Sequence, residues 1–180
     1  MSGEHQDTDR GDQLLRNVST LKIMWFGLFV GGLIINLLMI YLVVSNDGEP
    51  IVDLGDLGYL LFALVPLSLF AGFFIAPKIA PQDPRVVLEE ARRKGLPGYN
   101  SCDAVDPEDP LYWFPTYSAR ITLQLGFLEA GSVVSAIGFL TTANWAMLGG
   151  ALLLGAAMVV VIPNQSAAET FAEQAKARQS

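Results

Sequence analysis

The sequence is poor in cysteine, histidine and charge. Its 180 residues include one cysteine and one histidine, which excludes a disulfide framework and a His/Cys zinc site within a single chain. Charged residues make up only 16% of the chain, whereas apolar residues make up 52% and gather in long blocks. The net charge of −7 argues against nucleic acid as a partner. This composition is typical of a small membrane protein, and the length fits one domain.

Four apolar blocks are long enough to cross a bilayer, because each reaches the roughly 20 residues that about 30 Å of hydrocarbon requires. Backbone groups cannot stay unpaired in lipid, so the blocks are predicted to be helices. The first follows a long polar stretch and lacks a cleavage site, so it is not a cleaved signal peptide. The predicted spans are 23–44, 57–77, 121–141 and 143–163.

Basic residues lie on one side of this arrangement. All eleven Lys and Arg lie in three segments: before the first span, between the second span and the third, and after the fourth span. The outer loop over 45–56 carries acidic residues and no basic one. The positive-inside rule therefore places both termini in the cytoplasm, with the protein in the inner (cytoplasmic) membrane. We predict an all-α membrane protein whose four transmembrane helices form two antiparallel hairpins, the second closed by a short turn around 142–144.

The segments outside the spans are polar. Residues 1–20 are predicted to be a disordered cytoplasmic tail, and 164–180 a short helical cytoplasmic tail. The cytoplasmic loop over 78–120 should contain a helix over 84–94, with Asp83 as its N-cap and a proline at its first position. Two interpretations of this helix stay open: a solvated linker helix, or a surface helix that lies on the membrane or docks a partner.

The loop then continues through an acidic segment over 103–109. Its carboxylates could bind calcium, but the spacing is not that of an EF-hand and no glycine provides the turn, so we predict a solvated loop and no metal site. Cys102 is predicted to be a free cytosolic thiol. Tyr112 and Trp113, followed by Arg120, are typical of anchors at a membrane interface.

Glu129 is the one charged residue inside a predicted span. At the usual helical rise it lies about 13 Å beyond Arg120, close to the bilayer midplane. An ionised carboxylate there would be costly, so Glu129 should be protonated, hydrogen-bonded, bound to a cation or paired with another subunit. Asn36, Ser68 and Ser132 lie at depths that would allow a polar seam with it. Interhelical glue, an ion site and a partner contact are the three interpretations.

Small residues at helical spacing predict close helix packing. Gly27 and Gly31 form a GxxxG pattern in the first span, and Gly126 with Ala130 form a small-xxx-small pair in the third. Two further pairs are Gly131 with Ser135 and Ala146 with Gly150.

The last third of the chain carries a resemblance. From Tyr117 to Pro163 it reads Y-S-A-R, L-x-F-L-E-A-G and I-G-F-L-T-T-A-N, and ends in I-P-N. This resembles a group of small, uncharacterised four-span bacterial membrane proteins, which implies a location and a topology but no activity. A weaker similarity is to the proteolipid rotor subunit of rotary ATPases, whose ion-carrying carboxylate Glu129 would match. Because Glu129 lies in the first helix of its hairpin and the loop is far longer, the rotor function is not carried over.

The residues favour a structural role over an enzymatic one. A membrane aspartyl protease needs two intramembrane carboxylates, and a Ser-His or Cys-His pair needs a usable histidine; the chain offers neither. We expect no cofactor. The expected function is a structural, assembly or accessory subunit, with the bilayer and a homo-oligomer or a larger membrane complex as partners. The alternative is an oligomeric proton or cation pathway centred on Glu129.

Overall fold

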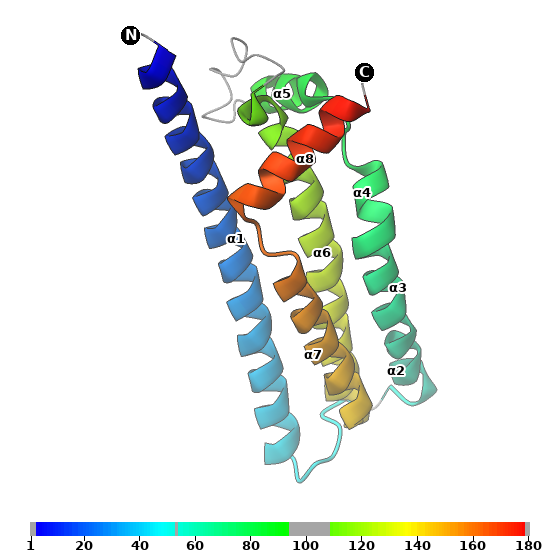
Figure 1. Cartoon of the computed structure of the whole chain (residues 1–180). Coiled ribbons are helices and arrows are strands. Elements are labelled where there is room, and N and C mark those ends of the chain that lie inside the picture. Colours follow the sequence, from blue (N-terminus) through cyan, green and yellow to red (C-terminus); the bar gives the residue numbers. More distant parts are fainter. Residues whose placement is uncertain (1–2, 53, 94–108, 179–180) are drawn as a thin grey trace. The chain divides into compact units, whose positions relative to one another are not determined.

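The computed structural model describes residues 3–52, 54–93 and 109–178 (Figure 1). Apart from turns these residues are helical, and none of them lies in a strand, which confirms the all-α prediction. Three helical stretches, 11–45, 58–79 and 110–142, are long and apolar enough to cross a membrane, and a fourth is reached if α7 and α8 are counted together as one broken span. The helices are α1 Gly3–Ser45, α2 Asp56–Leu60, α3 Leu64–Phe70, α4 Ala76–Ile79, α5 Pro84–Arg93, α6 Pro110–Thr142, α7 Trp145–Val160 and α8 Gln165–Ala177.

The chain forms two compact units. Unit 1 comprises the described residues of 1–24, 78–122 and 163–180, and unit 2 comprises those of 25–77 and 123–162. All eleven Lys and Arg of the sequence fall within the ranges of unit 1. Unit 2 therefore contains no basic side chain.

Helix α1 begins at Gly3, where the polar composition predicted a disordered tail over residues 1–20. The tail prediction overlooked a stripe of apolar residues at helical spacing. Leu14, Val18 and Leu21 lie on one face of the helix and are at most 5% exposed. Burial of this stripe within unit 1 offsets the entropy of ordering the segment.

The second apolar block is helical from Asp56 to Ile79 but is not a regular α-helix. A 3₁₀ turn over Leu61–Ala63 precedes Pro66, and a π-helical turn over Ala71–Ile75 precedes Pro77. Proline lacks an N–H and its ring clashes with the carbonyl four residues earlier, so the hydrogen-bonding pattern shifts before each proline.

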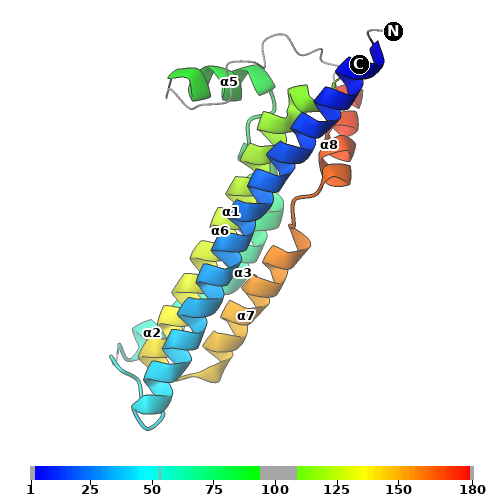
Figure 2. The same cartoon turned by 90° about the vertical axis from the view of Figure 1, so that its left-hand side faces the viewer.

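In unit 2, α6 lies beside α1, α3 and α7 (Figures 1 and 2). The Ser135 hydroxyl of α6 donates to the Met147 carbonyl of α7 at 2.6 Å. Gly131 of α6 packs against Ser68 of α3, and Gly150 of α7 packs against Ser135. Close packing is therefore confirmed at Gly131, Ser135 and Gly150, whereas Ala146, the predicted partner of Gly150 in its pair, is exposed.

The other predicted packing pairs lie on different faces. A side chain at Gly27, Gly31 or Gly126 would meet no described heavy atom within 4 Å, and Ala130 is exposed. These four residues therefore bring no helices together among the described residues of this chain, and packing against another chain, which the sequence left open, stays a prediction. On α1 the close approach is made by Gly32 instead, one residue and about 100° of helical rotation away from Gly31.

Helix α7 is shorter than the predicted span over 143–163. It follows a turn in which Ala143 has a φ of 49° and the Asn144 side chain caps the helix, accepting from the Ala146 N–H at 2.9 Å. It ends at Val160, so its 16 residues are about 24 Å long. Pro163 cannot continue the helix, and α8 begins anew after Asn164, whose side chain accepts from the Ala167 N–H at 2.7 Å.

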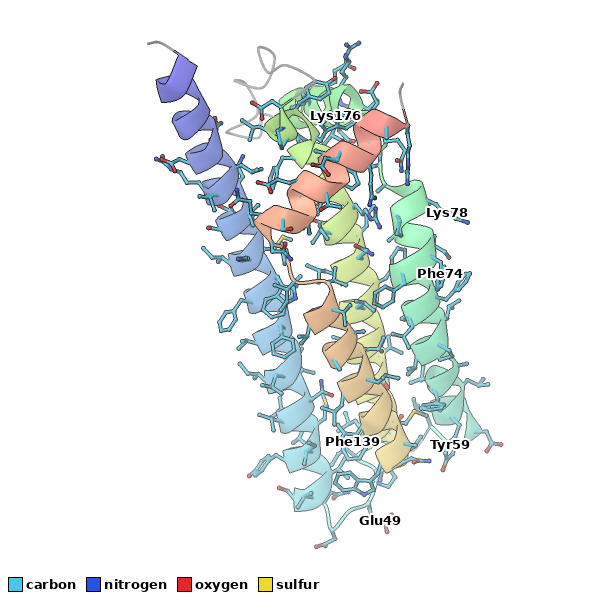
Figure 3. The ribbon with its side chains drawn as sticks, in the orientation of Figure 1. Glu49, Tyr59, Phe74, Lys78, Phe139 and Lys176 are labelled. Atoms are coloured by element: carbon cyan, nitrogen blue, oxygen red, sulfur yellow. The ribbon has the colours of Figure 1, made fainter. Side chains whose placement is uncertain are left out.

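Large apolar side chains cover the outside of unit 2. Tyr59 and Phe74 are more than half exposed, whereas Phe139 is fully buried (Figure 3). A water-soluble surface rarely carries such contiguous apolar area, so this surface fits a lipid environment. Other exposed members are Ile34, Leu37, Tyr41, Leu60, Phe70 and Val160.

In unit 1, α5 begins as predicted. The Asp83 carboxylate accepts from the Arg85 N–H at 2.9 Å, and Leu88 of this helix is buried. Of the acidic segment over 103–109, only Asp109 is described, and it accepts from the Leu111 N–H at 2.8 Å as the cap of α6. The rest of that segment, together with Cys102, lies outside the described residues.

Candidate functional site

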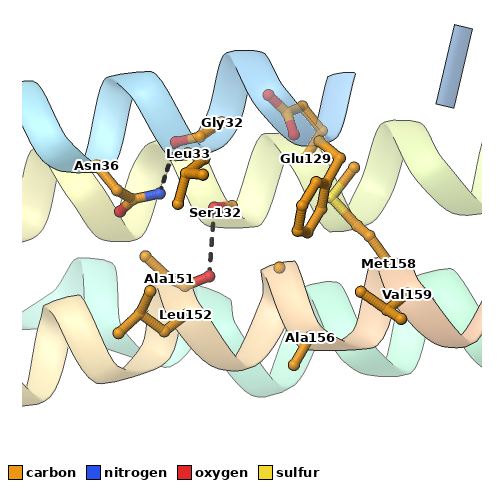
Figure 4. Close-up of a pocket in the computed structure, with 12 residues that line it drawn as sticks. Gly32, Leu33, Asn36, Glu129, Ser132, Ala151, Leu152, Ala156, Met158 and Val159 are labelled. Atoms are coloured by element: carbon orange, nitrogen blue, oxygen red, sulfur yellow. Dashed lines mark hydrogen bonds between the residues drawn. The ribbon is translucent and has the colours of Figure 1, made fainter. Parts of the chain in front are cut away.

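Glu129 lies in a pocket of unit 2 that α1, α6 and α7 form together (Figure 4). The cavity measures about 240 Å³. Asn36 from α1 and Ser132 from α6 supply its other polar side chains. The walls are apolar: Phe29, Leu33, Leu152, Met158 and Val159.

Gly32 makes room for the carboxyl group. A Cβ atom on Gly32 would lie 3.2 Å from Oε2 of Glu129 and 3.5 Å from Oε1. The Gly32 carbonyl accepts a hydrogen bond of 2.8 Å from the Asn36 amide, one helical turn further along α1. Gly32 thus fixes the Asn36 amide group and lets the Glu129 carboxyl group approach the backbone of α1.

Two oxygen atoms in this pocket lack a donor. Oε2 of Glu129 and Oδ1 of Asn36 are buried and have no hydrogen-bond partner among the described residues. A buried acceptor without a donor costs about 1–3 kcal/mol. The Ser132 hydroxyl points elsewhere, donating to the Ala151 carbonyl of α7 at 3.4 Å. The site therefore presents acceptors that only an added proton, cation or donor group can satisfy.

No family model, curated protein or solved structure matches the chain.

Three of the four residues predicted for a polar seam meet in this pocket. Asn36, Glu129 and Ser132 line it, but Ser68 packs against Gly131 instead. Residues 129 and 131 are about 200° apart around a helix, so one side chain cannot reach both faces. The seam prediction is corrected at Ser68, because depth in the bilayer was known and the rotation of α6 was not.

Sequence analysis missed one end of the pocket. The Trp25 indole N–H donates at 2.8 Å to the Met158 carbonyl in the last turn of α7, a carbonyl that also accepts from the Val161 N–H at 3.1 Å. Trp25 also stacks on Phe29, with ring centroids 5.3 Å apart. Phe29 and Met158 both line the pocket, so this contact ties α1 to α7 there. The tryptophan near a span end was the only signal available in the sequence.

The donor set limits the chemistry of the site. Among the described residues no group of three or more His, Cys, Asp or Glu could hold a metal ion. One carboxyl group and one amide oxygen, enclosed by apolar walls, suit a hydrogen-bond donor or a single positive charge.

Proposed function

We propose that the chain is a multi-pass protein of the cytoplasmic membrane, with unit 2 in the bilayer, four spans in two antiparallel hairpins, and both termini in the cytoplasm. The support is the segregation of charge. Every basic residue belongs to unit 1, whereas unit 2 has an apolar surface and an outer loop without Lys or Arg. α7 would be the fourth span, and its length of about 24 Å suits a locally thinned bilayer.

Cysteine labelling tests this topology. In a Cys102→Ser background, single cysteines replace Glu49 in the outer loop or Ser166 in α8, both exposed positions. A membrane-impermeant maleimide added to intact cells should label the first and not the second. Permeabilised cells should label both. Labelling of position 166 in intact cells would overturn the proposed orientation.

We further propose that the protein is an accessory or assembly subunit whose Glu129 pocket receives a donor group from a partner within the membrane. The observation that carries this proposal is a pair of buried oxygens, Glu129 Oε2 and Asn36 Oδ1, for which the described part of the chain supplies no donor. A cavity of about 240 Å³ is smaller than the roughly 300–1,000 Å³ of most small-molecule sites, so it suits a single side chain. A Lys, Arg or amide group of a partner helix has the required chemistry.

A proton or cation site is the second candidate, favoured by the same unpaired carboxyl group. A pathway, however, needs further polar groups on either side of Glu129. The neighbouring hydroxyls of Ser132 and Ser135 already donate to carbonyls of α7. A pathway would therefore require an oligomer in which several copies bring their carboxyl groups together.

Labelling with a hydrophobic carbodiimide, mapped by mass spectrometry, separates the two candidates. A docked partner should protect Glu129 in native membranes, and purification should expose it. The variant Glu129→Gln is the negative control, and the exposed Glu173 of α8 reports on reaction with a water-soluble carbodiimide.

Two other results would contradict the partner proposal. Labelling in membranes and after purification alike, with loss of labelling on addition of sodium, would favour the ion site. A Glu129 that stays unlabelled in both preparations at every pH would be packed away as interhelical glue.

A further inference from the structure

A second pocket lies in unit 1, outside the site described above. It measures about 290 Å³. Trp113 and Arg120 line it from α6, Phe171 and Gln174 from α8, Arg178 from the C-cap of α8, and Gln82 from the segment before α5. The pocket is thus assembled from three stretches of unit 1 that are far apart in sequence.

Helical spacing explains why these side chains meet. Trp113 and Arg120 are two turns apart on α6, so both lie on the same face of that helix. Phe171 and Gln174 lie three residues apart on one face of α8, and the C-cap residue Arg178, whose backbone is still in the right-handed helical region, continues that face at i+7. The two arginines and both aromatic rings of the pocket are therefore placed by the helical spacing of α6 and α8, whereas Gln82 comes from the connection before α5.

Positive charge is concentrated in this pocket, which both Arg120 and Arg178 line. The Arg120 guanidinium lies 5.8 Å from the centroid of the Phe171 ring, a cation–π contact that fixes its orientation. Arg178 lines the same pocket, and its positive charge disfavours the charged form of Arg120. No carboxylate of the described residues forms an ion pair with either guanidinium. Two like charges held together in this way are stabilised by an anion between them.

We propose that this pocket binds a phosphate group, and that the phosphate is the headgroup of an anionic phospholipid in the cytoplasmic leaflet. Guanidinium groups present forked donors that match phosphate oxygens, and a glutamine amide adds a neutral donor. The half-buried ring of Phe171 lines the pocket beside Arg120, and the buried Trp113 closes it from the α6 side. An anionic lipid headgroup is the phosphate source at hand for arginines at the cytoplasmic end of a span. Soluble phosphate has the same chemistry, so the experiment must separate the two sources.

The choice of a lipid rests on the proposed membrane orientation, whereas phosphate binding does not. Lipid binding is measured by native mass spectrometry of the full chain in detergent, with phosphatidylglycerol or phosphatidylcholine added. Inorganic phosphate is titrated in a parallel series. Failure of the topology proposal would leave the phosphate titration unaffected, so the two failures are distinguishable.

The variants Arg120→Gln and Arg178→Gln each remove one guanidinium, and Arg16→Gln removes the same charge from an exposed position of α1 outside the pocket. The unaltered chain should retain phosphatidylglycerol in preference to phosphatidylcholine. Each pocket variant should weaken that retention about tenfold, the effect of losing one charge-assisted hydrogen bond. Arg16→Gln should bind like the unaltered chain. Because Arg178 is exposed, its replacement leaves the fold intact even where that of Arg120 does not.

Each outcome bears on the proposal. Arginine-dependent retention of phosphatidylglycerol supports the lipid site. Arginine-dependent binding of inorganic phosphate without a lipid preference overturns the lipid source and keeps the phosphate site. Equal weakening by Arg16→Gln and Arg178→Gln would show attraction by net charge alone and would overturn the pocket.

Discussion

Two adjacent glycines of α7 offer a matched test of helix packing in unit 2. A Cβ atom on Gly150 would lie 2.8 Å from Cγ2 of Val65 and 2.9 Å from Oγ of Ser135. A Cβ atom on Gly149 would meet no described atom within 4 Å. The two residues share a helix and a depth, so replacement by alanine changes helix propensity equally, by about 1 kcal/mol in favour of the helix. The variants differ only in the face on which the methyl group lies.

The magnitude follows from what each new methyl group must displace. Overpacking a tight contact costs about 1–3 kcal/mol. Val65 is stiff at its first side-chain torsion, and the Ser135 hydroxyl is held by its hydrogen bond of 2.6 Å to Met147, so neither can move away freely. We therefore expect Gly150→Ala to be less stable than Gly149→Ala by about 1–3 kcal/mol, whereas Gly149→Ala should match or exceed the unaltered protein.

Unfolding of the detergent-solubilised protein by titration with sodium dodecyl sulfate, followed by tryptophan fluorescence, measures this difference. The double variant Val65→Ala/Gly150→Ala provides the structural control, because truncation of Val65 removes the atom closest to the new methyl group. The free energy of unfolding that the double variant loses should be smaller, by about 1 kcal/mol, than the sum of the losses of the two single variants. Coupling of that size is within the range observed for residues in contact. Equal stabilities of Gly149→Ala and Gly150→Ala, or additivity in the double variant, would refute the packing described for α3, α6 and α7.

Three other substitutions test local features. Ala143→Gly should stabilise the protein by about 0.5–1 kcal/mol in the same titration. Relief of the left-handed conformation gains about 1–2 kcal/mol, and the greater freedom of glycine in the unfolded state takes back part of this gain. A lower stability of the variant would contradict this. Trp25→Phe should cost about 1 kcal/mol by removing the hydrogen bond to Met158 while keeping an aromatic ring, and an unchanged stability would count against that bond. Asp83→Ala removes the cap on the Arg85 N–H, so amide hydrogen exchange should accelerate in α5 alone; faster exchange throughout unit 1 would contradict a local role.

Features under strong local or solvent constraints could be predicted from the sequence. A bilayer leaves a hydrophobic segment few alternatives to a helix, so the long apolar helices follow from hydropathy. The start of α5 follows from Asp83 and the proline after it. The aspartate side chain caps the helix, and proline suits the first helical position because an N–H there would have no partner within the helix. The turn before α7 follows from Asn144 for the same kind of reason. In each case the determining interaction lies within a few residues of the chain.

Features that depend on helix rotation could not be predicted. Gly31 and Gly32 are neighbours in sequence, yet only Gly32 faces α6. Ser68 has the right depth for the Glu129 pocket but faces Gly131. Small residues show that helices can approach closely, but they do not show which face is used, and one residue shifts the face by about 100°. The early start of α1 was missed for another reason, because a buried stripe at Leu14, Val18 and Leu21 outweighed a polar composition.

The Glu129 pocket combines both kinds of feature. Its carboxyl group was evident from the sequence as the one charge in a predicted span. The carboxyl group fits into the pocket because Gly32 has no side chain. A Cβ atom at that position would lie 3.2 Å from one carboxyl oxygen of Glu129 and 3.5 Å from the other. A search for reactive residues cannot find such a position, because its contribution is the absence of a side chain. Glu129 and Asn36 therefore supply the two acceptor oxygens of the site, and the rotation of α1 that turns Gly32 toward α6 allows both oxygens to lie in the pocket.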